Sequence, residues 1–193
     1  MKSHALSPDL PEISLGHLAG TGSTGEVYVA ELTAAWRELE SGSSVAIKRL
    51  LPALWGDRAK EKRLLAEGEL GLGLSSPGLV RVFAAGRRMN EATPELVMEW
   101  IPGDTLDGLL CEGTCPEPLL RSLAQLIGDG LSCLHTAGYA HADVKPENIR
   151  LDGNGRARLL DLGYATPFHP DTLGAPPTHD PGSLSREYSR IRA

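Results

Sequence analysis

Short runs of apolar residues with a β-strand composition fill the first half of the chain. Residues 26–32 (Glu-Val-Tyr-Val-Ala-Glu-Leu) alternate between polar and apolar side chains, and residues 45–50 (Val-Ala-Ile-Lys-Arg-Leu) are rich in branched aliphatic ones. Residues 79–85 and 95–98 are similar runs, and residues 13–18 lead into a glycine-rich turn. Because side chains of a strand point alternately to the two faces of a sheet, this pattern predicts a β-rich first half.

Two longer stretches carry apolar residues at helical spacing instead. Residues 57–74 combine many charges with leucines that recur on one side, and residues 119–138 repeat leucine and isoleucine through five turns. Both patterns predict helices. In the first of them Gly68, Gly71 and Gly73 each cost about 0.8–1 kcal/mol relative to alanine, so we expect a weak helix there.

The last third of the chain predicts a loop, a hairpin and a polar tail. Residues 149–160 place apolar runs on both sides of an Asp-Gly-Asn-Gly sequence, which is typical of a hairpin turn. Residues 167–193 are rich in Pro, Gly, Ser, Thr and His and show no periodicity. We therefore expect a loop or a disordered tail after residue 166.

Composition and charge exclude some classes of function. The 193 residues are 41% hydrophobic and 23% charged, which is ordinary for a globular protein with a buried core. The net charge of −6 argues against a general nucleic-acid-binding protein, which would usually be basic. No apolar run is long enough to cross a bilayer, so no membrane association is expected.

The chain also suggests a cellular compartment. Residues 1–12 lack the apolar core of a signal peptide, and we interpret them as an N-terminal extension. Cys111, Cys115 and Cys133 are an odd number without partners at the spacing of a metal site. These features predict reduced thiols and a cytoplasmic location.

A glycine-rich turn lies between the first two predicted strands. Gly20, Gly22, Gly25 and Val27 follow the pattern G-x-G-x-x-G-x-V. Glycines allow backbone amides to approach a triphosphate without a clash with Cβ, and Val27 could cover an adenine ring. Similar glycine patterns open dinucleotide-binding folds, but there a helix follows, whereas residues 26–32 predict a strand. A plain hairpin turn is the alternative.

A lysine and a glutamate are candidates for the phosphate end of such a site. Lys48 closes the sequence Val-Ala-Ile-Lys, where its ammonium could reach the α- and β-phosphates from the inner face of a strand. A lysine exposed on a half-buried strand is the alternative. The predicted helix over residues 57–74 carries Glu67 and Glu69, either of which could be an acidic partner for this lysine or a solvated helix acid.

The densest cluster of reactive side chains lies between residues 141 and 163. Phosphoryl transfer needs a group that orients the attacking hydroxyl, ligands for Mg²⁺ and cations for the phosphates. Asp143 suits the first role, Asn148 and Asp161 suit the second, and Lys145 suits a contact to the transferring phosphate. We interpret the nearby His141 as a structural residue of the loop. The predicted hairpin returns the chain so that Asp161 lies beside Asn148, where both could share one metal ion.

These motifs, in this order, resemble those of the eukaryotic-like (Hanks-type) Ser/Thr protein kinases over residues 13–165. The resemblance implies an α+β, bilobal protein kinase-like fold, with a β-rich N-lobe that contains one helix and an abbreviated helical C-lobe. It places the N-lobe at residues 13–98, the hinge at 99–103 and a partial C-lobe at 104–166.

The resemblance also implies ligands and roles. It makes Glu67 our choice for the acid that pairs with Lys48, with Glu69 as second choice. ATP and Mg²⁺ would be the cofactors, with adenine held by Val27, Ala46, Met98, Glu99 and Ile101. Lysine two residues after the catalytic aspartate, as in Lys145, is a feature of the kinases that modify serine and threonine. The implied partners are a protein substrate or an activating protein, and the oligomeric state stays open.

Two positions and the stretch after Gly163 depart from the family pattern. Ala142 replaces an arginine that usually meets a phosphate on the activation loop, so we expect no switching of that kind. Leu162 replaces a phenylalanine and can still fill an apolar slot. Only about thirty residues follow Gly163, without helical periodicity, so we expect most of the substrate-binding helical lobe to be missing.

Four functions are compatible with these observations. The first is a minimal Ser/Thr protein kinase. The alternatives are a nucleotide-binding pseudokinase or scaffold, a small-molecule phosphotransferase of kinase-like fold, and a truncated gene product. Lys145 and the Val-Ala-Ile-Lys sequence favour the protein kinase over the small-molecule enzyme.

Overall fold

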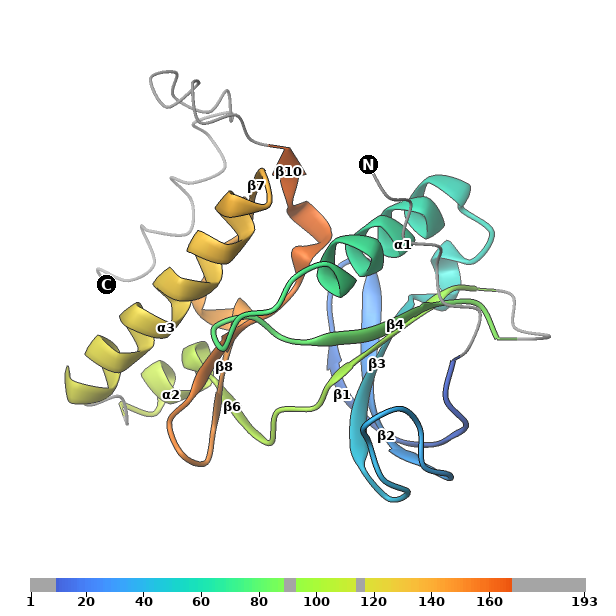
Figure 1. Ribbon diagram of the computed structural model, residues 1–193, viewed down its shortest axis with the longest axis horizontal. Coiled ribbons are helices and arrows are strands. Elements are labelled where there is room, and N and C mark those ends of the chain that lie inside the picture. Colours follow the sequence, from blue (N-terminus) through green and yellow to red (C-terminus); the bar gives the residue numbers. More distant parts are fainter. Residues whose placement is uncertain (1–9, 89–92, 114–116, 168–193) are drawn as a thin grey trace.

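The computed structural model describes residues 10–88, 93–113 and 117–167 (Figure 1). Its N-terminal lobe is an antiparallel sheet of five strands with one long helix, and its C-terminal lobe combines two helices with short strands. The N-terminal elements are β1 (Ile13–Thr21), β2 (Gly25–Leu32), β3 (Ser44–Leu50), η1 (Pro52–Leu54), α1 (Arg58–Leu72), β4 (Val82–Gly86) and β5 (Glu95–Glu99). The C-terminal elements are β6 (Gly103–Thr105), α2 (Leu106–Cys111), α3 (Glu117–Thr136), β7 (Tyr139–Ala140), η2 (Pro146–Asn148), β8 (Ile149–Asp152), β9 (Ala157–Leu159), η3 (Leu162–Tyr164) and β10 (Thr166–Pro167).

The five-stranded sheet has the order β1-β2-β3-β5-β4, which places β3 at its centre. Val45 and Ile47 of β3 belong to the hydrophobic cluster on one face of the sheet, whereas Ala46 belongs to the cluster on the face that packs against α1. The alternation continues to Lys48, which follows Ala46 onto that second face. The sequence of β3 therefore directs one lysine toward the rest of the molecule.

Helix α1 packs closely against the sheet, and its glycines are the reason. The side chain of Asp57 caps the helix by accepting hydrogen bonds from the N–H groups of Ala59 and Lys60. A Cβ atom at Gly68 would lie 2.3 Å from the Cβ of Ala85, and one at Gly71 would lie 2.3 Å from Cγ2 of Val82. Gly68 and Gly71, two of the three glycines that predicted a weak helix, thus permit a short distance between α1 and β4, whereas Gly73 lies just after α1 as its C-cap.

Substitutions at two helical glycines are therefore expected to have opposite effects. Gly68→Ala should destabilise the protein by about 1–3 kcal/mol, because the added methyl group would overlap the Cβ of Ala85, which no side-chain rotation can move away. Gly128→Ala, in α3, meets nothing within 4 Å and should stabilise by up to about 1 kcal/mol through helix propensity. Urea denaturation of both variants measures the difference. Equal effects at the two sites would contradict the role assigned to close packing.

The C-terminal lobe has its own hydrophobic cluster, which α2, α3 and the β8–β9 hairpin share. Strands β6, β8 and β9 form one small sheet, and β7 pairs with β10. Helix α2 was not predicted, because its six residues are too few to show a period. The described part of the chain contains no helix that is long and apolar enough to cross a membrane.

The segment before β4 differs from the prediction of one strand over residues 79–85. Strand β4 begins only at Val82, and Leu79 instead forms a parallel bridge with Leu159 of β9. Leu79 also packs in the hydrophobic cluster of the C-terminal lobe. Residues 78–80 thus tie the two lobes together beside the hinge.

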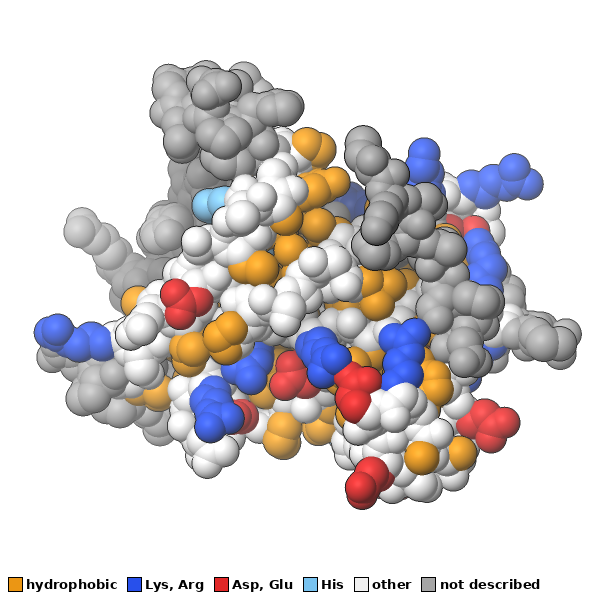
Figure 2. All heavy atoms as spheres, viewed as in Figure 1, with side chains coloured by type: hydrophobic (Ala, Val, Ile, Leu, Met, Phe, Trp, Pro, Cys, Tyr) orange, Lys and Arg blue, Asp and Glu red, His pale blue; other side chains and the backbone are white. Residues whose placement is uncertain are grey.

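Separate hydrophobic clusters in the two lobes, with the five-stranded sheet in the first lobe, confirm the predicted α+β, bilobal architecture. Between the lobes, β5 ends at Glu99 and β6 begins at Gly103, so three residues join them. A groove lined by Leu70, Leu74, Tyr139 and other residues separates α1 from the C-terminal end of α3, where Figure 2 shows a band of hydrophobic side chains.

Most of the predicted N-terminal extension and all but one residue of the predicted tail lie outside the described residues.

Candidate active site

A cleft of about 400 Å³ lies between the two lobes. Residues from the glycine-rich turn, β3, α1 and the hinge line it from the N-terminal lobe, and residues from the loop before β8 and from η3 line it from the C-terminal lobe. All the residues predicted to bind nucleotide or metal or to take part in catalysis line this cleft: Gly20, Gly22, Gly25, Val27, Ala46, Lys48, Glu67, Met98, Glu99, Ile101, Asp143, Lys145, Asn148 and Asp161.

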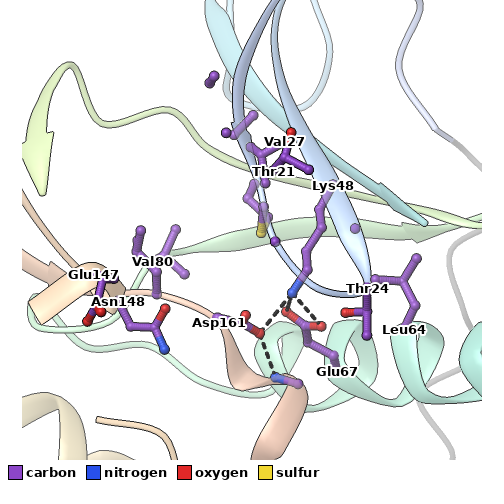
Figure 3. A pocket seen from close by; sticks show the side chains of 18 of the residues that line it. Thr21, Thr24, Val27, Lys48, Leu64, Glu67, Val80, Glu147, Asn148 and Asp161 are labelled. Carbon is purple, nitrogen blue, oxygen red and sulfur yellow. Dashed lines mark hydrogen bonds and ion pairs between the residues drawn. The ribbon is translucent and has the colours of Figure 1, made fainter. Parts of the chain in front are cut away.

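Lys48 joins the two lobes at the inner end of the cleft (Figure 3). Its Nζ lies 2.7 Å and 2.9 Å from the two carboxylate oxygens of Glu67 and 2.8 Å from Oδ1 of Asp161. Glu67 is buried on the inner side of α1, whereas Glu69 is exposed on the outer side. Of the two candidates, Glu67 is therefore the acid that contacts Lys48.

The three charges of this cluster depend on one another. Burial alone would lower the pKa of Lys48, but Glu67 and Asp161 outweigh it and hold that pKa above its ordinary value. Burial raises the pKa of Glu67, so this acid depends on Lys48 for its charge. Burial also opposes ionisation of Asp161, yet Lys48 and the Gly163 N–H hold its pKa below the ordinary value. Lys48 is thus protonated at neutral pH, and two acids share its single charge.

Asp143 lies at the C-terminal-lobe side of the cleft and is held by two neighbours. The amide Nδ2 of Asn148 donates hydrogen bonds to the backbone oxygen of Asp143 at 2.9 Å and to its Oδ2 at 2.8 Å. The Nζ of Lys145 lies 3.2 Å from the same Oδ2. Because these contacts engage one carboxylate oxygen and the amide nitrogen, Oδ1 of Asp143 and Oδ1 of Asn148 remain for ligands.

His141 stabilises the loop that carries Asp143. Its ring is buried, with Nε2 3.0 Å from the oxygen of Leu160 and Nδ1 accepting the N–H of Asp143 at 3.3 Å. Burial lowers its pKa, which favours the neutral ring that these two bonds require. The next residue, Ala142, has a φ of 62°, in the left-handed region that non-glycine residues rarely adopt. His141 thus shapes the loop and is not among the residues that line the cleft.

The turn after Asp161 is tied to α1 by a residue that sequence reasoning missed. Asp161 has a φ of 58°, and its Oδ1 accepts the N–H of Gly163 at 3.0 Å. The Nε of Arg63 donates to the oxygen of Gly163 at 2.6 Å, and its guanidinium lies 4.3 Å from the ring centre of Tyr164. Arg63 precedes Glu67 by four residues and so shares its helix face, which was the available signal.

The glycine-rich turn forms the roof of the cleft. A Cβ atom at Gly25 would lie 2.6 Å from the backbone oxygen of Arg49, so the close pairing of β2 and β3 requires glycine there. A Cβ atom at Gly20 would meet nothing within 4 Å, and one at Gly22 would meet only the Gly25 oxygen, at 3.8 Å. Packing inside the protein therefore explains one of the three glycines, and close approach of a ligand remains the prediction for the other two.

The outer half of the cleft is apolar. Val27, Ala46 and Met98 line it as predicted, and Val80 and Leu160 complete it. Sequence analysis did not select Val80 and Leu160. Leu160 follows the buried Leu159, so the alternation of β9 was the signal that it faces the cleft.

The charged half of the cleft fits a phosphate-bound divalent cation. The described residues contain no group of three or more His, Cys, Asp or Glu side chains that could hold a metal ion alone. Magnesium is usually held by one or two carboxylates together with substrate phosphates. Asp161, the amide oxygen of Asn148 and the surplus negative charge around Lys48 suit that arrangement.

Comparison with known proteins identifies the family. A model of the protein kinase domain matches residues 13–184, which is most of the 193 residues. The chain belongs to the protein kinase domain family. The kinase motifs from the glycine-rich turn to Asp161 all lie within the matched range.

Several curated protein kinases resemble this kinase-domain chain. Serine/threonine-protein kinase pkn2 of Myxococcus xanthus is 34% identical over 159 residues, which cover 81% of this chain and 18% of the relative. Mitogen-activated protein kinase kinase kinase 3 of Arabidopsis thaliana is 34% identical over 155 residues, or 77% of this chain and 22% of the relative. CBL-interacting protein kinase 4 of Oryza sativa subsp. japonica is 34% identical over 170 residues, or 86% and 35%. The chain thus spans from about a fifth to about a third of the length of these relatives.

Proposed function

We propose that this chain catalyses transfer of the γ-phosphoryl group of ATP to serine and threonine hydroxyls of a protein. The observation that carries the proposal is the cluster in which Lys48 contacts Glu67 from its own lobe and Asp161 from the other. Asp143 and Lys145 line the same cleft at hydrogen-bonding distance from each other. Similarity to serine/threonine-protein kinases supports this choice of acceptor.

In this proposal the apolar half of the cleft holds the adenine ring and the charged half holds the triphosphate. Lys48, fixed by Glu67, contacts the α- and β-phosphates, and Asn148 and Asp161 hold Mg²⁺. When bound, Mg²⁺ neutralises charge on the phosphate oxygens. The glycine-rich turn closes over the phosphates with its backbone N–H groups.

The chemical step then requires two groups of the C-terminal lobe. The hydroxyl oxygen of the acceptor attacks the γ-phosphorus as the bond from phosphorus to the ADP oxygen breaks. Asp143 orients the hydroxyl and accepts its proton, while Lys145 contacts an oxygen of the transferring group. The contacts of Asn148 and Lys145 to Oδ2 of Asp143 hold the carboxylate in one orientation.

A transfer assay tests this function. Purified protein is incubated with Mg²⁺ and γ-labelled ATP, with and without a generic protein substrate such as casein. We expect label on serine or threonine of the chain or of the added protein. Label that appears only on sugars or aminoglycosides, or thermal stabilisation by ATP without any transfer, would overturn the proposal.

A further inference from the structure

Two arginines of the β8–β9 hairpin hold the segment between the lobes. The Nε of Arg150 donates to the backbone oxygen of Ile101 at 2.7 Å, and its guanidinium lies 4.6 Å from the ring centre of Trp100. Arg158, which pairs with Arg150 across the hairpin, places its Nε 3.6 Å from the carboxylate of Glu99. Of the two arginines, Arg150 alone lines the cleft.

The position of Arg150 follows from the alternation of β8. Ile149 and Leu151 point into the hydrophobic cluster of the C-terminal lobe, so Arg150 faces the opposite side, toward the hinge. An arginine can lay its methylene stem along an apolar wall while its guanidinium reaches a polar partner. The stacking on Trp100 and the bond to Ile101 fix the guanidinium, so its charge has a defined place beside the outer half of the cleft.

This contact changes what the hinge can offer to a nucleobase. The backbone of Glu99 and Ile101 borders the apolar half of the cleft, and the Ile101 oxygen is an acceptor already bound by a cation. Adenine presents an amino donor at position 6, an acceptor at N1 and only a C–H at position 2. Guanine and 2-aminoadenine carry a second amino donor at position 2.

We propose that Arg150 is a specificity-determining residue that selects against purine nucleotides with an amino group at position 2. The inference rests on the proposed binding of ATP, and it adds that position 6 of the base lies toward Glu99 and position 2 toward Ile101. A 2-amino group there meets an occupied carbonyl and a neighbouring cation, so it gives up its hydrogen bond to water without a full replacement. Adenine has only a C–H at position 2, so it loses no hydrogen bond there.

Calorimetric titration with two nucleotides tests the inference. ATP and 2-aminoadenosine triphosphate differ in a single amino group, so the ratio of their dissociation constants isolates its effect. The unchanged protein should prefer ATP by about tenfold, the usual order for an unsatisfied buried donor. In Arg150→Met, which keeps the stem and removes the guanidinium, the preference should fall below about threefold.

Arg158→Met is the matched control, because it removes the other arginine that contacts the hinge but does not line the cleft. It should keep the tenfold preference for ATP. A change in general stability would alter the dissociation constants of both nucleotides by the same factor and so leave their ratio unchanged. Arg150→Lys retains the charge and a donor, so it should keep most of the preference for ATP. This variant can still test the role of Arg150 if Arg150→Met does not fold.

The outcomes separate the two proposals. Equal preference in the unchanged protein and in Arg150→Met, or loss of preference in Arg158→Met, would overturn the role of Arg150 while ATP binding stands. A lysine variant that binds both nucleotides equally would overturn it as well. If the unchanged protein binds neither nucleotide, the proposed function fails and base selection fails with it.

Discussion

Replacing Asp143 by asparagine is expected to lower the rate of phosphoryl transfer by at least about 10²-fold, the usual contribution of a positioned general base. Asparagine has nearly the same shape and can still accept the hydrogen bond from Asn148, so the loop should keep its structure. It cannot take a proton from the acceptor hydroxyl. The loss should therefore appear in kcat, while the dissociation constant for ATP changes little.

Asp129→Asn is the matched control for this variant. Asp129 is exposed on α3 and is not among the residues that line the cleft. The same loss of charge there should leave the rate within about twofold, as for most surface substitutions. Single-turnover measurements with γ-labelled ATP compare the two variants. An unchanged rate in Asp143→Asn would remove the role assigned to this residue.

Replacing Lys48 by methionine is expected to destabilise the fold and to abolish measurable binding of ATP. The ammonium of Lys48 is largely buried and contacts two acids, so its loss leaves Glu67 enclosed without the cation that keeps this acid charged. Breaking a buried ion pair by removing one member costs about 3–5 kcal/mol. Chemical denaturation measures the stability, and calorimetry with Mg²⁺ and ATP measures the binding.

A double variant separates stability from binding. Lys48→Met combined with Glu67→Leu replaces the pair with apolar side chains, an exchange that often costs little. It should recover at least half of the lost stability, because Asp161 is one-third exposed and can be solvated, yet it should not recover ATP binding. Lys62→Met, on the exposed side of α1, should change neither quantity. A double variant as unstable as Lys48→Met would exclude the unpaired Glu67 as the cause.

Much of the site was predictable because its motifs are local and their order along the chain is distinctive. Lys48 follows from the sequence of one strand, and Asp143, Lys145 and Asn148 lie within six residues of one another. Asp161 follows after one hairpin. Residues so close in sequence cannot lie far apart in the fold, and all of them line the cleft.

Other features were not predictable, because they depend on how closely two distant segments approach. The glycines of α1 indicated a weak helix, but contact with Ala85 and Val82 gives them a packing role. Leu79 fitted a strand of the first sheet, yet it pairs with Leu159 of the other lobe. No local pattern distinguishes these alternatives, since each is decided by a partner many residues away.

By itself, the sequence determined the bilobal α+β kinase fold, the family and the motif residues that meet in the cleft. Hydrophobic periodicity sets which side of a strand or helix is buried, and motif order sets the topology. Only the tertiary structure decided that Arg63 ties α1 to Gly163 and that Arg150 occupies the Ile101 carbonyl. It also showed the contact of Lys48 with Glu67, the first choice from the sequence. Such contacts arise where side chains from separate elements converge, and their free energies depend on burial and distance, which the order of residues does not specify.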